Sequence, residues 1–311
     1  MSGQETDISW QMLRRIVHDW LGTAAELAEV RTLSGGCISN TLSLKIRGGA
    51  RAVIKISPHR VDRSYLQEAY QLNLLRSLGL PTPQVYSCKI GTLAEPHSYL
   101  LMEYLEGIDL AKARRDCREE DFDHLQMHLA DLVLRLHANT SSCYARLSEE
   151  ERQEFSSWPK FYRSVYDPIW KEAEKEAGLP VKMRKQIGKI HQKLDKILTH
   201  DDCPRLVHWD IWASNILTQA DANGKWWVTA LLDPNCKYAH AEAELAYLEL
   251  FNTVSPAFMR VYQSAHRLPA EYQTLRKPIY QLYPLINHVQ LFGQGYIKPL
   301  AAAVERAAQV V

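Results

Sequence analysis

The chain lacks the cysteine spacing that a disulfide framework or a zinc site would need. Its six cysteines are scattered through 311 residues, and no two of them form a C-x-x-C pair. In a chain of this length, isolated cysteines are typical of reduced thiols. We therefore expect a protein of the cytoplasm.

An excess of one charge is also missing, as is a long uncharged apolar run. Lys plus Arg number 37 and Asp plus Glu 36, which gives a formal net charge of +1. No overall field favours nucleic acid or an anionic membrane. The first residues, MSGQETDISW, hold no basic region followed by an apolar core, so we expect no signal peptide. The apolar stretch 239–254 carries three glutamates, so no membrane span is expected.

The first part of the chain has the patterns of a small β-rich lobe. Alternating, β-prone residues flank the turns of RTLSGGCISNTLSLKI and ARAVIKI, whereas residues 8–21 have a helical apolar period. A second helix is expected over 62–78, where Gly79 ends it, and two more strands over 85–90 and 99–104. This N-terminal lobe is predicted to span residues 1–104.

Beyond Gly107 the pattern turns helical. Between residues 122 and 136, apolar residues recur at gaps of three and four, which is typical of one buried helix face. Further helices are expected over 158–177, over 181–198 and from 241 to the end, with breaks at Pro256, Pro269 and Pro284. Short strands are expected at 206–208 and 227–232. The sequence predicts an α+β, two-lobe, protein-kinase-like fold with a large helical lobe over 105–311, and 46% apolar residues suffice for two cores.

The stretch HWDIWASN lies between the two short strands and has a catalytic spacing. His208, Asp210 and Asn215 fit H-x-D-x-x-x-x-N, the catalytic loop of protein-kinase-like phosphotransferases. In such a loop the aspartate accepts the proton of an attacking hydroxyl, and the asparagine oxygen is a neutral Mg²⁺ ligand. Asp233, in the form D-P-N after the strand VTALL, would supply an anionic oxygen to the metal.

Upstream residues supply groups that could hold nucleotide phosphates. Lys55 in AVIKI matches the strand lysine of V-A-I-K, and Glu68 on the following helix can pair with it. Ser34-Gly35-Gly36 matches a loop whose backbone N–H groups approach phosphates. These residues predict an ATP site.

The stretch LLMEYLE, residues 100–106, fits a strand that ends in an interlobe hinge. Its backbone would hydrogen-bond adenine, which makes Met102, Glu103 and Tyr104 candidate nucleotide contacts. An alternative reading of the loop aspartates and asparagine is that they only cap turns. Turn chemistry does not require Lys55 and Glu68, so we favour the kinase reading.

At the level of whole motifs, the sequence resembles the fructosamine kinase (ketosamine 3-kinase) family, near the aminoglycoside phosphotransferases. GGCISNT looks like that family's glycine loop, and HWDIWASN looks like its H-G-D-L-W-S-G-N. DPNCKYAHAEAELAYLELF is similar to D-P-A-x-Y-Y-G-H-R-E-x-D-L-A-M-x-E-L-F. The tail over 276–296, RKPIYQLYPLINHVQLFGQGY, resembles R-x-x-L-Y-x-L-Y-x-L-L-N-H-x-x-x-F-G-x-x-Y, a motif absent from ordinary protein kinases.

The resemblance implies a kinase-like fold that uses ATP and Mg²⁺. It implies phosphoryl transfer to a sugar hydroxyl, O3, of a ketosamine such as fructosamine or ribulosamine, small or protein-bound, in a repair role. Carried over residue by residue, it assigns these roles: base, Asp210; metal ligands, Asn215 and Asp233; ion pair, Lys55 and Glu68; acceptor side, Trp212; brace of the catalytic loop, Glu244. His288, in the tail motif, is placed on the acceptor side and is expected to bond backbone there, because Asp210 already fills the acid–base role.

Four departures from the family pattern lie near the acceptor. Trp209 replaces a glycine, Ala213-Ser214 stand for Ser-Gly, and Lys237 and Ala239 turn Y-Y-G into K-Y-A. None of them removes a catalytic group, so they bear on the substrate. Trp209 either faces the acceptor cleft, where an indole could stack on a sugar, or packs beneath the loop.

Cys37 directly follows the two glycines of the phosphate loop. It is either a small residue that fits a tight turn or a reactive thiol, since backbone N–H groups that attract phosphate also stabilise a thiolate. The second reading predicts reversible oxidation, so the chain is expected to be a monomer or a redox-linked homodimer.

Two other functions remain open from the sequence. One is a small-molecule phosphotransferase acting on an aminoglycoside or an amino-alcohol; the tail motif argues against it and the Trp209 change slightly for it. The other is a binding-only pseudokinase, which usually lacks one of Lys55, Asp210 and Asp233, and all three are present.

Overall fold

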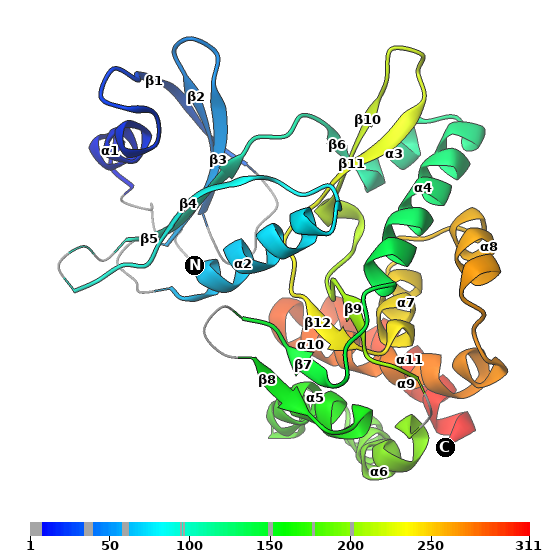
Figure 1. Ribbon diagram of the computed structural model, residues 1–311. Coiled ribbons are helices and arrows are strands. Elements are labelled where there is room, and N and C mark those ends of the chain that lie inside the picture. The colour runs from blue at the N-terminus through cyan, green and yellow to red at the C-terminus, as the bar shows by residue number, and fades with distance from the viewer. Residues whose placement is uncertain are drawn as a thin grey trace. The chain divides into compact units, whose positions relative to one another are not determined.

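The computed structural model describes residues 8–33, 40–57, 62–93, 95, 97–148, 152–175, 178–199 and 202–311. These residues form two compact units. The first comprises the described part of Met1–Asp116 together with Ser148 and Ser214–Asn235, and the second comprises Cys117–Leu147, Arg152–Ala213 and Cys236–Val311. The first unit is rich in strands and the second in helices (Figure 1), so the predicted α+β class is confirmed.

The first unit is built on a five-stranded antiparallel sheet in the order β1-β2-β3-β5-β4. Its strands are β1 (Leu27–Thr32), β2 (Asn40–Ile46), β3 (Arg51–Ser57), β4 (Val85–Lys89) and β5 (Ser98–Glu103). These strands match the ones expected from the alternating sequence. β3 lies between β2 and β5, and Lys55 stands opposite Leu100 of β5.

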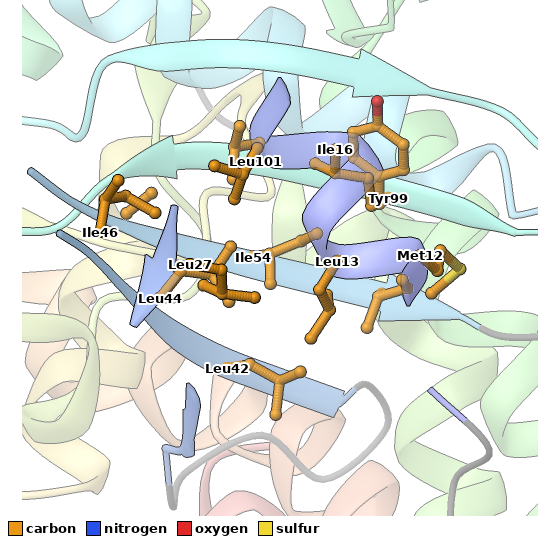
Figure 2. Packing of buried hydrophobic residues seen from close by; sticks show 13 residues of the cluster. Met12, Leu13, Ile16, Leu27, Leu42, Leu44, Ile46, Ile54, Tyr99 and Leu101 are labelled. Carbon is orange, nitrogen blue, oxygen red and sulfur yellow. The ribbon is translucent and has the colours of Figure 1, made fainter. Parts of the chain in front are cut away.

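Two helices use opposite faces of this sheet. Helix α1 (Trp10–Leu21) begins at Ser9, whose Oγ accepts the N–H of Met12. Figure 2 shows side chains of α1 packed against sheet residues such as Ile54 and Leu101. Helix α2 (Ser64–Ser77) instead packs against Leu100 and Met102. Successive strand residues point to opposite faces, so the face that carries Leu100 and Lys55 is the one that meets α2.

A three-stranded sheet, in the order β11-β10-β6, completes the first unit. Its parts are β6 (Ile108–Asp109), β10 (Ile216–Ala220) and β11 (Trp226–Leu231), and helix α3 (Leu110–Asp116) follows β6. The expected hairpin at Trp226 and Trp227 is confirmed. The expectation that one ring is buried and the other exposed was wrong: both are half-buried, and the indole of Trp227 lies beneath the ammonium of Lys225.

The second unit has a four-stranded sheet in the order β8-β7-β12-β9. Its strands are β7 (Tyr144–Arg146), β8 (Gln153–Phe155), β9 (Arg205–Val207) and β12 (Lys237–Ala239). Its helices are α4 (Glu119–His137), α5 (Trp158–Lys175), α6 (Val181–Leu198), α7 (Ala241–Leu250), α8 (Pro256–Ala265), α9 (Lys277–Tyr280), α10 (Leu282–Phe292) and α11 (Ile297–Val310). The predicted apolar face of α4 is buried.

The C-terminal prolines act differently from one another. Pro256 is the first residue of α8, next to the capping hydroxyl of Ser255. Pro269 lies in the loop after α8, as expected. The break expected at Pro284 was wrong, because this residue lies in the first turn of α10, where a helix needs no N–H donor. No helix among the described residues has both the length and the apolarity to cross a membrane.

Candidate active site

Lys55 forms the centre of a charged cluster in the first unit. Its side chain points from β3 toward α2 and is buried. The Nζ atom donates to Oε1 of Glu68 at 2.7 Å and to Oδ1 of Asp233 at 2.6 Å. The structure therefore brings together three predicted site residues that are far apart in sequence.

The charge of Lys55 is secured by its two carboxylate neighbours. Burial by itself lowers the pKa of Lys55, but Glu68 and Asp233 together outweigh burial, so the pKa is raised above its ordinary value. The ammonium group is therefore charged at neutral pH. A fixed cation in a buried position is suited to binding phosphate oxygens.

A cavity of about 380 Å³ adjoins this cluster and belongs wholly to the first unit. One part of its wall is apolar, with Val53, Leu72 and Leu217, and another holds Lys55 and Asp233. The three residues predicted for the hinge also line it: Met102, Glu103 and Tyr104. The N–H of Glu103 already donates to the carbonyl oxygen of Gln84 at 2.8 Å, so a bound base would meet other backbone groups. An apolar wall with a charged end suits a nucleotide.

Asn215 and Asp233 both line this cavity and could hold a magnesium ion. The backbone N–H of Leu232 donates to the carbonyl oxygen of Asn215 at 2.8 Å, which ties the two segments together. Asp233 has a φ of 55°, so the chain turns sharply after β11. No group of three or more His, Cys, Asp or Glu side chains in the described ranges could hold a metal by itself. One amide oxygen and one carboxylate nevertheless fit Mg²⁺, which usually takes its other ligands from water and phosphates.

Asp210 lies in the second unit, in the loop that follows β9. Its Oδ1 accepts a hydrogen bond from the hydroxyl of Tyr247 on α7 at 2.7 Å. Burial raises the pKa of Tyr247, and the negative charge of Asp210 raises it further. The phenol therefore remains protonated and acts as the donor. This bond occupies one carboxylate oxygen and fixes the orientation of the side chain.

The backbone beside Asp210 is held by Glu244, which is almost completely buried. Oε1 of Glu244 accepts the N–H of Trp209 at 2.6 Å. Its Oε2 lies 2.8 Å from Nε2 of His137, whose Nδ1 lies 2.7 Å from the hydroxyl of Tyr262. A chain of buried polar groups thus supports the peptide that precedes the aspartate.

Trp209 adopts a φ of 69°, a conformation in which side chains other than glycine are strained. Its half-buried ring packs against Phe161 and Tyr283, with centroid distances of 6.2 and 6.1 Å. The ammonium of Lys237 lies 5.1 Å from the same ring. Trp212, by contrast, is 38% exposed. This geometry places Trp209 in an aromatic cluster and leaves part of its surface accessible.

Two histidines have structural surroundings. His208 is fully buried next to β9. Nδ1 of His288 lies 2.7 Å from the carbonyl oxygen of Pro284, as expected of a histidine that bonds backbone. Burial lowers the pKa of His288, so its ring is neutral at pH 7.

Some predicted residues lie outside the described part of the chain. These are Ser34, Gly35, Gly36 and Cys37. Other residues were missed by sequence reasoning, among them Tyr247, His137 and Tyr262. The only signal was for Tyr247, which stands where the quoted family motif has methionine.

Comparison with known proteins decides the family. The family described as fructosamine kinase matches residues 9–309. The chain belongs to the fructosamine kinase family. It is thus a phosphotransferase of the ketosamine-kinase type, with an alcohol group as acceptor. The Escherichia coli K12 protein named "Probable ketoamine kinase YniA" is 25% identical over 306 residues, which cover 96% of this chain and 98% of that protein.

Solved structures of similar proteins show the fold that this family member adopts. The structure named as a putative fructosamine-3-kinase from Thermobifida fusca has a TM-score of 0.75 at 23% identity and covers 97% of this chain and 100% of its own. The aminoglycoside phosphotransferase APH(4)-Ia, solved with AMP-PNP and hygromycin B, has a TM-score of 0.68 at 17% identity and covers 96% and 97%. Both are protein-kinase-like, and the predicted fold is confirmed.

Proposed function

We propose that this fructosamine kinase family member transfers the γ-phosphoryl group of ATP, with Mg²⁺, to a sugar hydroxyl of a ketosamine. The observation that carries the proposal is the cavity of the first unit, where Lys55 is held between Glu68 and Asp233. Sugar binding alone would not require such a cluster, whereas a nucleotide triphosphate would. The presence of Lys55, Asp233 and Asp210 together argues against a pseudokinase.

On the nucleotide side, each group has a distinct task. The Lys55 ammonium would bind phosphate oxygens, and Glu68 would keep it aimed along the cavity. Asn215 and Asp233 would hold Mg²⁺, which when bound neutralises charge on the phosphates. The apolar wall of the cavity would exclude water from the base.

On the acceptor side, Asp210 would accept the proton of the attacking hydroxyl. Tyr247 occupies Oδ1, which leaves Oδ2 for the substrate. Glu244 fixes the peptide N–H of Trp209, so the carboxylate is held before the acceptor arrives. Preorganisation of this kind reduces the entropy lost on reaching the transition state.

The acceptor would be a ketosamine, an amine glycated by a reducing sugar, phosphorylated at O3. The product then carries a phosphate on the carbon next to the carbonyl carbon. Phosphate leaves more readily than hydroxide, so this adduct would break down and free the amine. The biological role would be repair of glycation.

Turnover measurements with purified protein test the proposal. ATP consumption is followed with fructosyl and ribulosyl derivatives of lysine, and with kanamycin and choline as acceptors of the competing class. We expect turnover with the ketosamines only, dependent on Mg²⁺, and a phosphorylated O3 in the product by NMR. Turnover with kanamycin and with no ketosamine would replace this proposal by the aminoglycoside alternative.

A further inference from the structure

Two cationic side chains stand opposite each other on neighbouring strands of the second unit. Lys237 of β12 pairs in register with Arg146 of β7. Residues directly opposite each other in an antiparallel pair project to the same face. Like charges in such positions repel each other, so this arrangement opposes folding.

The surroundings of the two cations do little to relieve this repulsion. Lys237 is only 6% exposed, and its ammonium faces the ring of Trp209. Nη2 of Arg146 donates to the carbonyl oxygen and to Oγ of Ser164, and its buried Nε has no hydrogen-bond partner. Among the residues that the structure describes, no carboxylate lies within ion-pair distance of Arg146. The guanidinium group is therefore able to accept an anion.

Burial makes the charge of Lys237 expensive. It lowers the pKa of Lys237 to about 7, although Asp210 and Glu244 oppose the shift. A residue that destabilises the fold in two ways is a candidate for a functional role. Fold stability therefore does not explain this pair.

The pair lies close to the catalytic carboxylate within the second unit. The charge of Lys237 interacts with that of Asp210, and Tyr283 interacts with both Arg146 and Asp210. Trp209 links them, because it precedes Asp210 in the chain and its ring adjoins Lys237. An acceptor whose hydroxyl reaches Asp210 would thus bring its other groups near two cations.

We propose that Lys237 and Arg146 bind an anionic group of the acceptor, the carboxylate of a glycated amino acid. This inference rests on the proposed ketosamine kinase activity and names the substrate class of that same site. A carboxylate can accept hydrogen bonds from an ammonium and a guanidinium at once. Polycationic acceptors such as aminoglycosides would be repelled by the same pair.

Another anion that the pair could bind is the phosphoryl group during its transfer. The two possibilities differ in what they predict for the acceptor. Contact with an acceptor carboxylate affects only acceptors that carry one. Contact with the phosphoryl group affects every acceptor equally.

A matched pair of acceptors separates these cases. The fructosamine of glycine carries a carboxylate, and the fructosamine of glycinamide has the same size without the charge. For the parent enzyme, we expect kcat/KM to be about tenfold higher for the glycine compound, as expected of hydrogen bonds to a charged group. Lys237→Met should remove most of this preference, Lys237→Arg should retain part of it, and the exposed Lys298→Met should keep all of it.

The comparison of two acceptors within one variant controls for folding, since a damaged fold lowers both rates. An equal loss for both acceptors in Lys237→Met and Arg146→Gln would overturn the inference. Equal kcat/KM for both acceptors in the parent would also overturn it and leave the proposed function standing. Absence of turnover with every ketosamine would remove the proposed function itself.

Discussion

The two sides of the active site are constructed in different ways. In the first unit, a lysine with two carboxylate partners lines an open cavity, and these residues follow the pattern expected of kinases. In the second unit, an aspartate is surrounded by aromatic rings and by a buried lysine. Trp209 and Lys237, the departures from the family motif, lie in the second unit.

The difference follows from what each side must recognise. Every acceptor requires the same nucleotide phosphates, so the charges that bind them have little freedom to change. The acceptor itself can vary, and the residues around Asp210 can vary with it as long as the carboxylate keeps its position. The reaction is therefore readable from the first unit and the substrate from the second.

The largest expected effect comes from removing the base. Asp210→Asn should lower kcat by at least ~10²-fold, the usual contribution of a positioned general base. Nucleotide affinity, measured by calorimetry, should stay the same. The exposed Asp131→Asn in the same unit is a matched control. Near-normal turnover by Asp210→Asn would exclude this residue from the mechanism.

On the nucleotide side, Asp233→Ala removes one metal ligand and one partner of Lys55. We expect a loss of turnover on the order of 10²-fold, because charge stabilisation of the phosphates is lost. The Mg²⁺ concentration for half-maximal rate should rise as well. A Mg²⁺ titration that coincides with that of the parent would show that the metal is held elsewhere.

A smaller effect is expected when Trp209→Gly restores the family residue. The change relieves a left-handed conformation that costs about 1–2 kcal/mol in other residues, but it also removes the ring beside Lys237. Acceptor preference should change, whereas ATP affinity should not. Trp227→Phe, on the hairpin of the first unit, is the control. If stability falls and preference among ketosamines stays constant, the ring serves packing alone.

The smallest expected effect is a dependence of stability on pH. Because the pKa of Lys237 falls from 10.5 in its ordinary state to about 7 in the fold, the unfolded chain binds more protons between these values. The stability of the parent should therefore rise with pH across this window. Charged or titratable neighbours of Lys237 are Cys236, Arg146, Asp210 and Glu244.

Methionine does not titrate, so Lys237→Met is the variant to compare. Its gain in Tm over the parent should be largest below pH 7, on the order of a few °C, and should shrink as the pH approaches 10.5. Thermal unfolding followed by circular dichroism measures this gain. A gain that is constant with pH would mean that Lys237 is not buried as a cation.

Sequence patterns predicted the parts of the fold that repeat over many residues. The apolar period of α4 and the alternation of the N-terminal strands are of this kind. Lys55 and Glu68 could be paired in advance because a strand and the next helix carry them. The bond between Tyr247 and Asp210 joins two elements with no shared pattern.

Short strands limited the prediction further. β7 and β12 have three residues each, too few for a period, and their pairing sets Arg146 opposite Lys237. Pro284 misled because a proline is compatible with the first turn of a helix as well as with a break.

The composition of the first unit has a consequence for synthesis on the ribosome. Strand β6 pairs with β10, and Lys55 contacts Asp233, yet both partners are translated long after the first sheet. Domains generally begin to fold from the N-terminus while the chain is still growing. During that interval the nascent chain carries a buried lysine with one of its two carboxylate partners. The kinase chemistry is thus completed only when the segment up to Asn235 has emerged, so an interrupted chain is catalytically silent.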